Sequence, residues 1–355
     1  MPSRTAPLRV PADVVAHLSR FNLTLPDLLT GAETPKMAKG ADLGRAVILH
    51  HLPARALAYA IRPGHRGATA PRSYLNALAI LAHREGLTDR ASRWNGCPWA
   101  TTGCEASCLN WAGHGGLSAA VASCRGRRTL AMIADPETYA RAILWAIARQ
   151  YAAALVDGVP LAVRLRGTDE GPAVGWHRLA LTLTTAEAAS IARRYGLPVQ
   201  PGDGLTLPDI LAPAGETIRL FDYSKAPLAG PLGLSAQRAA GWDVTASLAA
   251  DRPTAAADAL AALGAGFRLA VPVALVKGQA LPATLTLSAP GRPPLTVPAI
   301  DGDASDHRWA DPDGVAVILR TKISRGANPA LADPFSLRPT GHPQALPDGV
   351  ATLTW

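Results

Sequence analysis

The sequence predicts an α/β fold in which parallel strands form a barrel-like sheet, complete or partial. Short apolar segments of strand length alternate along the chain with segments of helical spacing. Most of the apolar segments run directly into polar or charged residues. All four cysteines lie within residues 97–124, ahead of most of the strands. Alternation of strands and helices is typical of a parallel sheet, and in a barrel the carboxyl ends of the strands share one mouth.

The predicted strands share a short apolar run that ends at a polar residue. They cover residues 46–52, 161–165, 217–221, 242–246, 267–275, 297–300 and 315–319. The predicted helices cover residues 11–20, 73–85, 185–194, 235–240 and 254–263, and residues 121–132 form a helix or turn. Residues 280–294, rich in Leu, Pro and Thr, indicate an insertion or a hairpin.

The helix after Asp135 has the clearest local signals. Asp135 suits the N-cap, Pro136 the first helical position, and Glu137 adds an acid in the first turn. Gly158 and Pro160 end it. Apolar residues recur every four positions and predict one buried stripe, at Tyr139, Ile143, Ile147 and Tyr151.

The length of 355 residues allows one large domain or two ordinary ones. The chain has no internal repeat and no long linker, which favours one domain. We expect an N-terminal lead segment at residues 1–45 and a single α/β domain at 46–325, with a cysteine loop at 93–116. A loop-rich tail is expected at 326–355.

The cysteine spacing indicates a metal or cluster site. Cys97, Cys104 and Cys108 follow a C-x6-C-x3-C pattern, with small residues between them. Three thiols this close suit a metal ion or an iron–sulfur cluster. The alternatives are buried core cysteines and a disulfide pair. The choice between iron–sulfur and zinc stays open, as does the role of Cys124; for zinc, His114 is a candidate fourth ligand.

The residues after the predicted strands supply the other site candidates. Gly167, Thr168, Asp169 and Glu170 form a turn with two acids and a hydroxyl, which can bind an amino or ribose group, or form a solvated turn. Asp222, Tyr223 and Lys225 can share acid–base chemistry or pair with one another.

The densest acidic run holds Asp301 and Asp303, with Asp306 close behind. Carboxylates at this spacing can bind a hard cation, although an EF-hand loop is not present. Arg308 can instead neutralise one of the acids. In a barrel, these strand ends would meet at one mouth, so we expect catalytic roles for Asp222, Lys225, Asp301 and Asp303.

The net charge of +8 is compatible with a nucleic-acid partner, although genome bias toward arginine gives the same balance. Arg125, Arg127 and Arg128 can bind phosphate or form a solvated face. His50 and His51 point to opposite faces of a strand and are poor joint ligands. The sequence has no secretory signal and no membrane-spanning apolar run, so we expect a cytoplasmic protein with no membrane partner.

Taken together, these segments resemble the phage and prophage proteins called the gene product 88-like family, whose activity is uncharacterised. The matching pieces are TPKMAKG (residues 34–40), CPWATTGCEASCLNWAG (97–113), RRT with DPETY (127–139), VRLRGTDE (163–170), FDYSK (221–225), DVTASL (243–248) and IDGDASDHRWAD (300–311). The resemblance implies a phage-related origin and a ligand set of Cys97, Cys104 and Cys108. Arg166 stands where that pattern has Asn, so either Asp169 or Glu170 matches its acid.

A weaker, fold-level resemblance is to the radical S-adenosylmethionine barrels. It implies a [4Fe–4S] cluster on three cysteines and S-adenosylmethionine bound at the turn of residues 167–170. The C-x6-C-x3-C spacing departs from the C-x3-C-x2-C of those enzymes.

Three functions follow as hypotheses. The first is an iron–sulfur enzyme that modifies a nucleotide or nucleic acid. The second is a zinc-containing barrel that exchanges or hydrolyses a nucleobase. The third is a non-enzymatic nucleic-acid-binding protein of phage origin.

Overall fold

The chain folds into two units that interleave along the sequence. The computed structural model describes residues 9–30, 40–53, 56–57, 72–108, 118–275, 278–321 and 335–355. Unit 1 comprises Met1–Pro98, Ser118–Leu220 and Ala240–Trp242, and unit 2 comprises Trp99–Leu117, Phe221–Ala239 and Asp243–Trp355. We expected one domain over residues 46–325, whereas both units draw on that range. His114 and residues 34–39 of the TPKMAKG segment lie outside the described residues.

The sheet of unit 1 contains short parallel strands in the order β1-β2-β3-β6. β2 (Arg45–Leu49), β3 (Leu161–Arg164) and the first residues of β6 (Ile218–Ser224) are parallel, and β1 (Leu29–Thr30) is antiparallel to β2. Every residue of β3 is buried, as expected for a parallel strand covered on both faces. The carboxyl ends of β2 and β3 are therefore adjacent.

Helix α8 (Pro136–Asp157) contacts most of the other elements of unit 1. The carboxylate of Asp135 accepts the N-cap hydrogen bond from the Thr138 amide at 3.1 Å, and Gly158 ends the helix with φ 70°. The predicted stripe is buried, at Tyr139, Ile143, Ile147 and Tyr151. These outcomes confirm the capping and periodicity signals.

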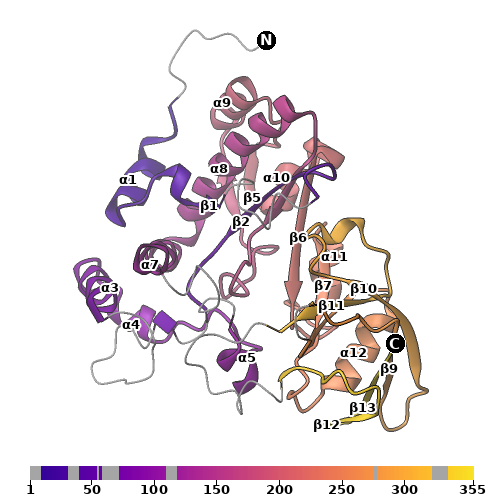
Figure 1. Cartoon of the computed structure of the whole chain (residues 1–355). Helices are drawn as coiled ribbons and strands as arrows, with labels where there is room; N and C mark the ends of the chain where they lie inside the picture. The colour runs from indigo at the N-terminus through magenta and orange to yellow at the C-terminus, as the bar shows by residue number, and fades with distance from the viewer. Residues whose placement is uncertain are drawn as a thin grey trace. The chain divides into compact units, whose positions relative to one another are not determined.

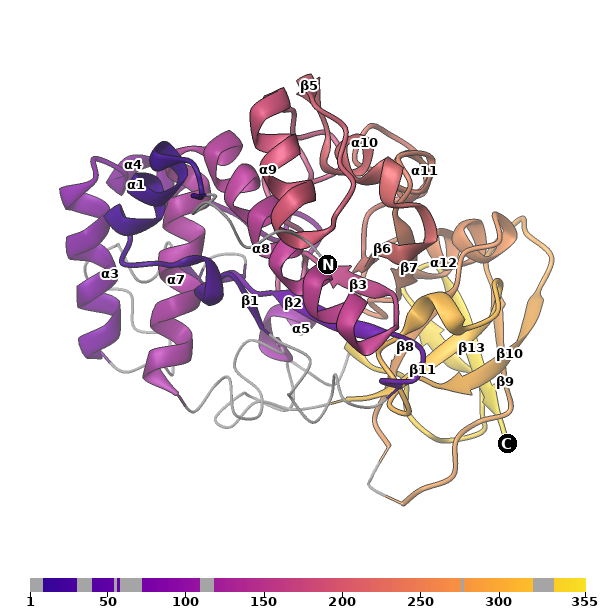
Figure 2. The ribbon, with the colours of Figure 1, turned by 90° about the horizontal axis from the view of Figure 1, so that it is seen from above.

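The remaining helices of unit 1 surround this core. Helix α7 lies beside α1, α3 and α4 (Figure 2). The helices are α1 (Ala12–Arg20), α3 (Arg72–Arg84), α4 (Thr88–Ser92), α7 (Ala119–Ala134), α9 (Thr185–Tyr195) and α10 (Leu207–Leu211). A two-stranded antiparallel ribbon joins β4 (Leu181–Leu183) to β5 (Gly202–Leu205).

The sheet of unit 2 has the order β6-β7-β8-β11-β10-β9-β13-β12. Most of these strands are labelled in Figure 1. Neighbouring strands are parallel among β6, β7, β8, β11 and β10. The pairs β10–β9, β9–β13 and β13–β12 are antiparallel. The strands are β7 (Asp243–Ser247), β8 (Leu269–Val273), β9 (Thr284–Ser288), β10 (Leu295–Asp301), β11 (Ala316–Arg320), β12 (Gln344–Leu346) and β13 (Gly349–Thr354). The helices are α5 (Thr102–Ala106), α11 (Leu234–Ala239) and α12 (Ala255–Gly264).

The α/β prediction is confirmed, but the described strands do not close into a barrel. In unit 2 the parallel strands give way to a hairpin of β9 and β10, as residues 280–294 suggested, followed by antiparallel β13 and β12. Leu285 and Leu287 of β9 are buried while its threonines are half-exposed, which is the alternation of a strand with one covered face. The tail at residues 326–355, which we expected to be loop-rich, contributes β12 and β13. Among the described strands, β12 lies at one edge of the sheet.

Candidate functional site

The cysteine segment contains a short helix, α5, that a side chain of unit 2 holds in place. The hydroxyl of Thr101 caps α5 by accepting from the Cys104 amide at 3.1 Å. The same hydroxyl donates to Asp251 Oδ1 at 2.7 Å, and the Gly103 amide donates to Asp251 Oδ2 at 2.9 Å. Asp251 lies in the loop after β7, so its carboxylate fixes α5 to that loop.

Gly103 allows this close approach because it has no side chain. A Cβ at this position would lie 2.7 Å from Asp251 Oδ2 and 2.8 Å from the Cβ of Phe335. Phe335 is itself tied to the β7–α12 loop, since its backbone oxygen accepts from the Ala250 amide at 3.3 Å. Any larger residue at position 103 would push α5 away from the loop.

The predicted metal ligands belong to both units. Cys97 is in unit 1, while Cys104 and Cys108 are in unit 2. All four cysteines are partly exposed, and the thiol of Cys97 lies 3.8 Å from the backbone oxygen of Thr168. Across the described ranges, no group of three or more His, Cys, Asp or Glu side chains can hold a metal ion. The three-cysteine site stays a prediction.

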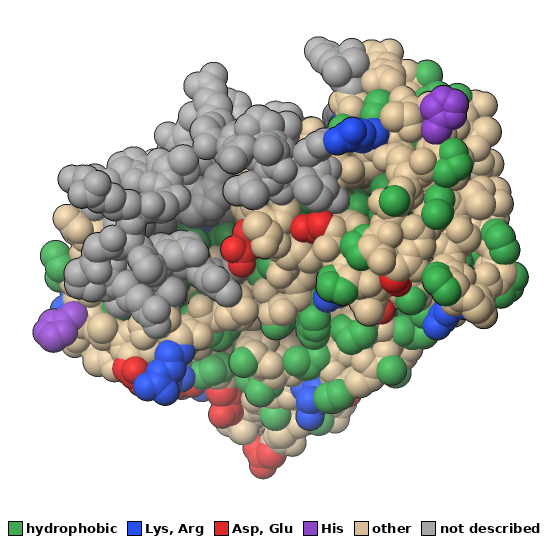
Figure 3. All heavy atoms as spheres, turned by 90° about the horizontal axis from the view of Figure 1, so that it is seen from below, with side chains coloured by type: hydrophobic (Ala, Val, Ile, Leu, Met, Phe, Trp, Pro, Cys, Tyr) green, Lys and Arg blue, Asp and Glu red, His purple; other side chains and the backbone are tan. Residues whose placement is uncertain are grey.

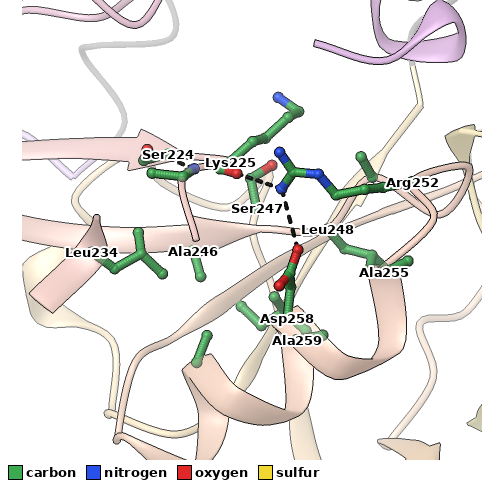
Figure 4. Close-up of a pocket in the computed structure, with 14 residues that line it drawn as sticks. Ser224, Lys225, Leu234, Ala246, Ser247, Leu248, Arg252, Ala255, Asp258 and Ala259 are labelled. Carbon is green, nitrogen blue, oxygen red and sulfur yellow. Dashed lines mark hydrogen bonds and ion pairs between the residues drawn. The ribbon is translucent and has the colours of Figure 1, made fainter. Parts of the chain in front are cut away.

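A shallow pocket lies in unit 2 at the carboxyl ends of β6 and β7 (Figure 4). Ser224 and Lys225 come from the end of β6, and Ser247 ends β7. Arg252 comes from the β7–α12 loop and Asp258 from α12. The rest of the lining is apolar, from Ala226, Leu234, Ala246, Leu248, Ala249, Ala255, Ala259, Ala262 and Leu269.

The charged groups of the pocket are held by specific contacts. Arg252 Nη1 donates to the backbone oxygen of Lys225 at 2.5 Å and lies 3.5 Å from Asp258 Oδ2 (Figure 4). The hydroxyl of Thr254 donates to the same carboxylate oxygen at 2.7 Å. The ammonium of Lys225 lies 5.8 Å from the ring centre of Phe335, within cation–π range. Lys225 and Arg252 are the cations of the pocket lining, and Asp258 lies beside Arg252.

The predicted catalytic residues have different surroundings. Lys225 lines the pocket. Asp222 is fully buried within β6 and is not part of the pocket lining. Asp301 is the last residue of β10 and Asp303 follows it, and Arg320 Nη1 lies 3.4 Å from a carboxylate oxygen of each. Arg320 therefore offsets one of the two negative charges that the sequence assigned to the mouth.

The acidic run after β10 also resolves into ion pairs. The Asp303 amide donates to Asp301 Oδ1 at 2.9 Å, which closes the turn. Arg308 Nη1 lies 3.0 Å from Asp311 Oδ2, as the alternative to cation binding anticipated. Burial raises the pKa of the Asp311 carboxyl, although Arg308 opposes the rise. These contacts favour structural roles for this run.

The turn at Gly167, Thr168, Asp169 and Glu170 lies beyond β3 in unit 1. The Gly167 amide donates to the backbone oxygen of Leu49 at 2.9 Å, and the Thr168 hydroxyl donates to that of His51 at 2.6 Å. Glu170 lies 3.4 Å from Arg166, so one of the two candidate acids is in an ion pair. The turn is thereby attached to the end of β2.

Asp169 belongs to a buried network that the sequence did not reveal. Its Oδ2 lies 3.2 Å from His51 Nδ1, and both side chains are 0% exposed. His51 Nε2 lies 3.1 Å from the hydroxyl of Tyr139. The network is satisfied if His51 Nδ1–H donates to the carboxylate and Tyr139 donates to Nε2. Burial raises the pKa of Tyr139, which keeps its proton in place.

Asp169 still has an unsatisfied oxygen. Its Oδ1 is buried and has no hydrogen-bond partner among the described residues. Buried acceptors of this kind are uncommon because desolvation without a donor costs free energy. Between the two acids of the turn, Asp169 is therefore the better candidate to meet a ligand.

Sequence reasoning missed Asp251, Arg252, His51 and Tyr139 as site residues. Ser247 was noted as a strand end, and it does line the pocket. Asp251 and Arg252 lie several residues beyond β7, where the sequence looks like an ordinary polar loop. The position of His51 at a strand end is the one local signal that pointed to it.

Comparisons with known proteins did not identify a related protein. No family model matches the chain, and no match was found among curated proteins or solved structures. Within the described ranges, every helix is too short or too polar to span a membrane. The function is therefore inferred from the chemistry of the residues themselves.

Proposed function

We propose that this chain is an enzyme acting on a nucleotide or nucleic acid, and that the unit 2 pocket binds a phosphate group of that substrate. The supporting observation is that Lys225 and Arg252 lie at one pocket, at the carboxyl ends of adjacent parallel strands. In open parallel sheets, this edge is the usual place for ligands. Guanidinium and ammonium groups both bind phosphate, the first as a planar fork and the second as a point charge.

The lining of the pocket offers further groups to the substrate. Ser247 can donate to a phosphate or sugar oxygen. Asp258 is held by Thr254 and Arg252 and is the candidate proton acceptor at the pocket.

The cysteine-held centre is a separate part of this proposal. Cys97, Cys104 and Cys108 are its proposed ligands, with a [4Fe–4S] cluster as the first expectation and zinc as the alternative. S-adenosylmethionine is proposed only together with a cluster. Because no group of three or more His, Cys, Asp or Glu side chains in the described ranges can hold a metal ion, we assign no chemical step to this centre.

A non-enzymatic nucleic-acid-binding role has less support from the surface. Such a protein needs a continuous basic face to follow the phosphate backbone. On the face drawn in Figure 3, Lys and Arg side chains of the described residues lie scattered among apolar and acidic ones. The two partly exposed cations at the unit 2 pocket favour recognition of a single phosphate group instead.

Binding measurements with a matched variant test the proposal. Nucleoside 5′-monophosphates should bind at least about tenfold more tightly than the corresponding nucleosides, because a charged hydrogen bond contributes about 1.5–3 kcal/mol. Lys225→Gln should weaken nucleotide binding by a similar factor. Arg292→Gln is the control, since Arg292 is an exposed cation in the turn between β9 and β10. Equal affinity for nucleotide and nucleoside, or an unchanged affinity in Lys225→Gln, would contradict the proposal.

A further inference from the structure

Two consecutive residues of the β7–α12 loop have different attachments in unit 2. Asp251 holds the cysteine segment, because its carboxylate accepts from the Thr101 hydroxyl at 2.7 Å and from the Gly103 amide at 2.9 Å. Arg252 lines the pocket and donates through Nη1 to the backbone oxygen of Lys225 at 2.5 Å (Figure 4). The Cα atoms of consecutive residues lie about 3.8 Å apart, so a displacement of Asp251 also displaces Arg252.

The backbone around Arg252 forms a closed turn. The Arg252 amide donates to the backbone oxygen of Ala249 at 3.0 Å, and the backbone oxygen of Arg252 accepts from the Ala255 amide at 3.0 Å. These two hydrogen bonds fix Arg252 on both sides, at the point where α12 begins. The turn therefore moves as a unit, and the place of the Arg252 guanidinium at the pocket depends on where Asp251 is held.

Phe335 connects the same helix to the second cation of the pocket lining. A Cβ on Gly103 would lie 2.8 Å from the Cβ of Phe335, so α5 packs against this side chain. The backbone oxygen of Phe335 accepts from the Ala250 amide at 3.3 Å, one residue before Asp251. The ammonium of Lys225 lies 5.8 Å from the ring centre of Phe335. All of these residues belong to unit 2, so α5 meets neighbours of both pocket cations within one unit.

The attachment of α5 is a local equilibrium. The helix has five residues, which is too few to persist without outside contacts. The Thr101 hydroxyl both caps α5 and donates to Asp251, so capping and attachment depend on one group. Segments held by a few hydrogen bonds open at a lower free energy than the core of a protein. The attached and detached states of α5 can therefore be biased from the pocket.

We infer that Asp251 is a positioning residue for the unit 2 pocket, and that attachment of α5 and phosphate binding stabilise each other. The inference rests on the proposed function, because it requires a phosphate group at Lys225 and Arg252. A phosphate that binds Arg252 in its attached position favours the attached state of α5. By reciprocity, attachment of α5 raises the affinity for the phosphate by the same factor. The cysteine segment is thereby a regulatory element of the pocket.

Two variants detach α5 by different means, with the binding of adenosine 5′-monophosphate (AMP) as the readout. Asp251→Asn leaves one acceptor atom in place of two, and Gly103→Ala places a Cβ 2.7 Å from Asp251 Oδ2. Each should weaken AMP binding about fivefold or more, the lower end of typical coupling between sites. Removal of a negative charge beside Arg252 would by itself tighten the binding of an anion, so a weaker affinity in Asp251→Asn reports lost positioning. Gly103→Ala keeps every charge and serves if Asp251→Asn does not fold.

Asp209→Asn is the matched control. Asp209 lies in unit 1 on the five-residue helix α10, and its carboxylate also accepts from an amide and a hydroxyl, those of Thr206, at 2.9 and 2.6 Å. The AMP affinity of this variant should equal that of the original chain. An affinity in Asp251→Asn or Gly103→Ala that matches the Asp209 variant would overturn the inference.

Hydrogen exchange at the Gly103 amide measures the attachment directly, because this amide donates to Asp251. Saturating AMP should slow its exchange about fivefold or more and should leave the amides of α10 unchanged. Equal exchange at Gly103 with and without AMP would overturn the inference.

The two measurements separate this inference from the proposed function. If AMP binds more tightly than adenosine and its affinity depends on Lys225, but exchange at Gly103 does not change, the inference is wrong and the proposed function stands. Equal affinities for AMP and adenosine would contradict both.

Discussion

The strand ends of the two units use the same position in a parallel sheet in different ways. In unit 1, the turn after β3 places Asp169 in a closed network with His51 and Tyr139. In unit 2, the ends of β6 and β7 leave a pocket with the partly exposed cations Lys225 and Arg252. A polar residue that follows a strand therefore joins a buried network or lines a pocket, depending on which segments cover the carboxyl end of that strand.

The largest expected effect concerns the cysteines, which are divided between the two units. If one centre holds Cys97, Cys104 and Cys108, replacing any of them by Ser should abolish bound metal, whereas Cys124→Ser should retain it. Anaerobic purification with metal analysis and a visible spectrum measures this. Broad visible absorbance with iron would support a cluster. A colourless protein with stoichiometric zinc would support the alternative, and the absence of both metals would remove the centre from the proposal.

Removing a partner from the buried network should strongly destabilise the protein. His51→Ala leaves the buried Asp169 carboxylate without this donor, and a buried acceptor that loses its partner costs about 1–3 kcal/mol, or more when it is charged. The free energy of unfolding from urea titration measures the loss. Lys225→Ala, at the partly exposed site in unit 2, should cost less than about 1 kcal/mol. Comparable losses in both variants would erase the contrast between the two strand ends.

The contact between Asp251 and the cysteine helix should have an intermediate effect. Asp251→Ala removes the acceptor for Thr101 and Gly103, with an expected cost of about 2 kcal/mol from charged hydrogen bonds. Release of α5 should also speed alkylation of Cys104 by a thiol reagent. Cys124, in unit 1, provides the internal control. An unchanged rate at Cys104 would show that Asp251 does not hold the segment.

The smallest expected effect is a pH dependence from unit 1. The pKa of His50 is lowered in the folded state, so below the ordinary histidine pKa of about 6.5 the unfolded chain binds a proton that the folded chain does not. Stability should therefore fall as the pH drops below that value. His17, whose pKa is also lowered by burial, acts in the same direction.

Denaturation curves between pH 5 and pH 8 on His50→Gln test this contribution. The variant should show a flatter decline at the acid end, with the His17 contribution left in place. A slope equal to that of the original chain would assign the acid sensitivity to other groups.

The sequence predicted most elements because their signals are local. Asp135 and Gly158 mark the ends of α8, and the apolar runs mark β3 and β8. The sequence did not predict β13 and β12, since their half-exposed residues resemble a loop and the pairing of β13 with β9 is distant in sequence. The barrel-like closure, expected to be complete or partial, is not shown by the described strands, because strand order is decided by long-range pairing.

The site was predicted less well than the fold. Lys225 and Ser247 lie at the pocket because each follows a recognisable strand. The assignment of Asp301 and Asp303 to the mouth did not anticipate Arg320, which comes from the end of another strand. Burial and ion pairing depend on neighbours that residue spacing does not show. The pairing of His51 with Asp169 across 118 positions is of this kind.

The carboxylate that holds the cysteine helix accepts from a hydroxyl and from a backbone amide. A helix of five residues is too short to persist by itself, so its shape is maintained by that attachment. Small zinc-binding domains, by contrast, fold only when the metal arrives. In this chain, the segment around Cys104 should already be in place before anything binds to its sulfur, and it should remain there after the sulfur has been oxidised or replaced.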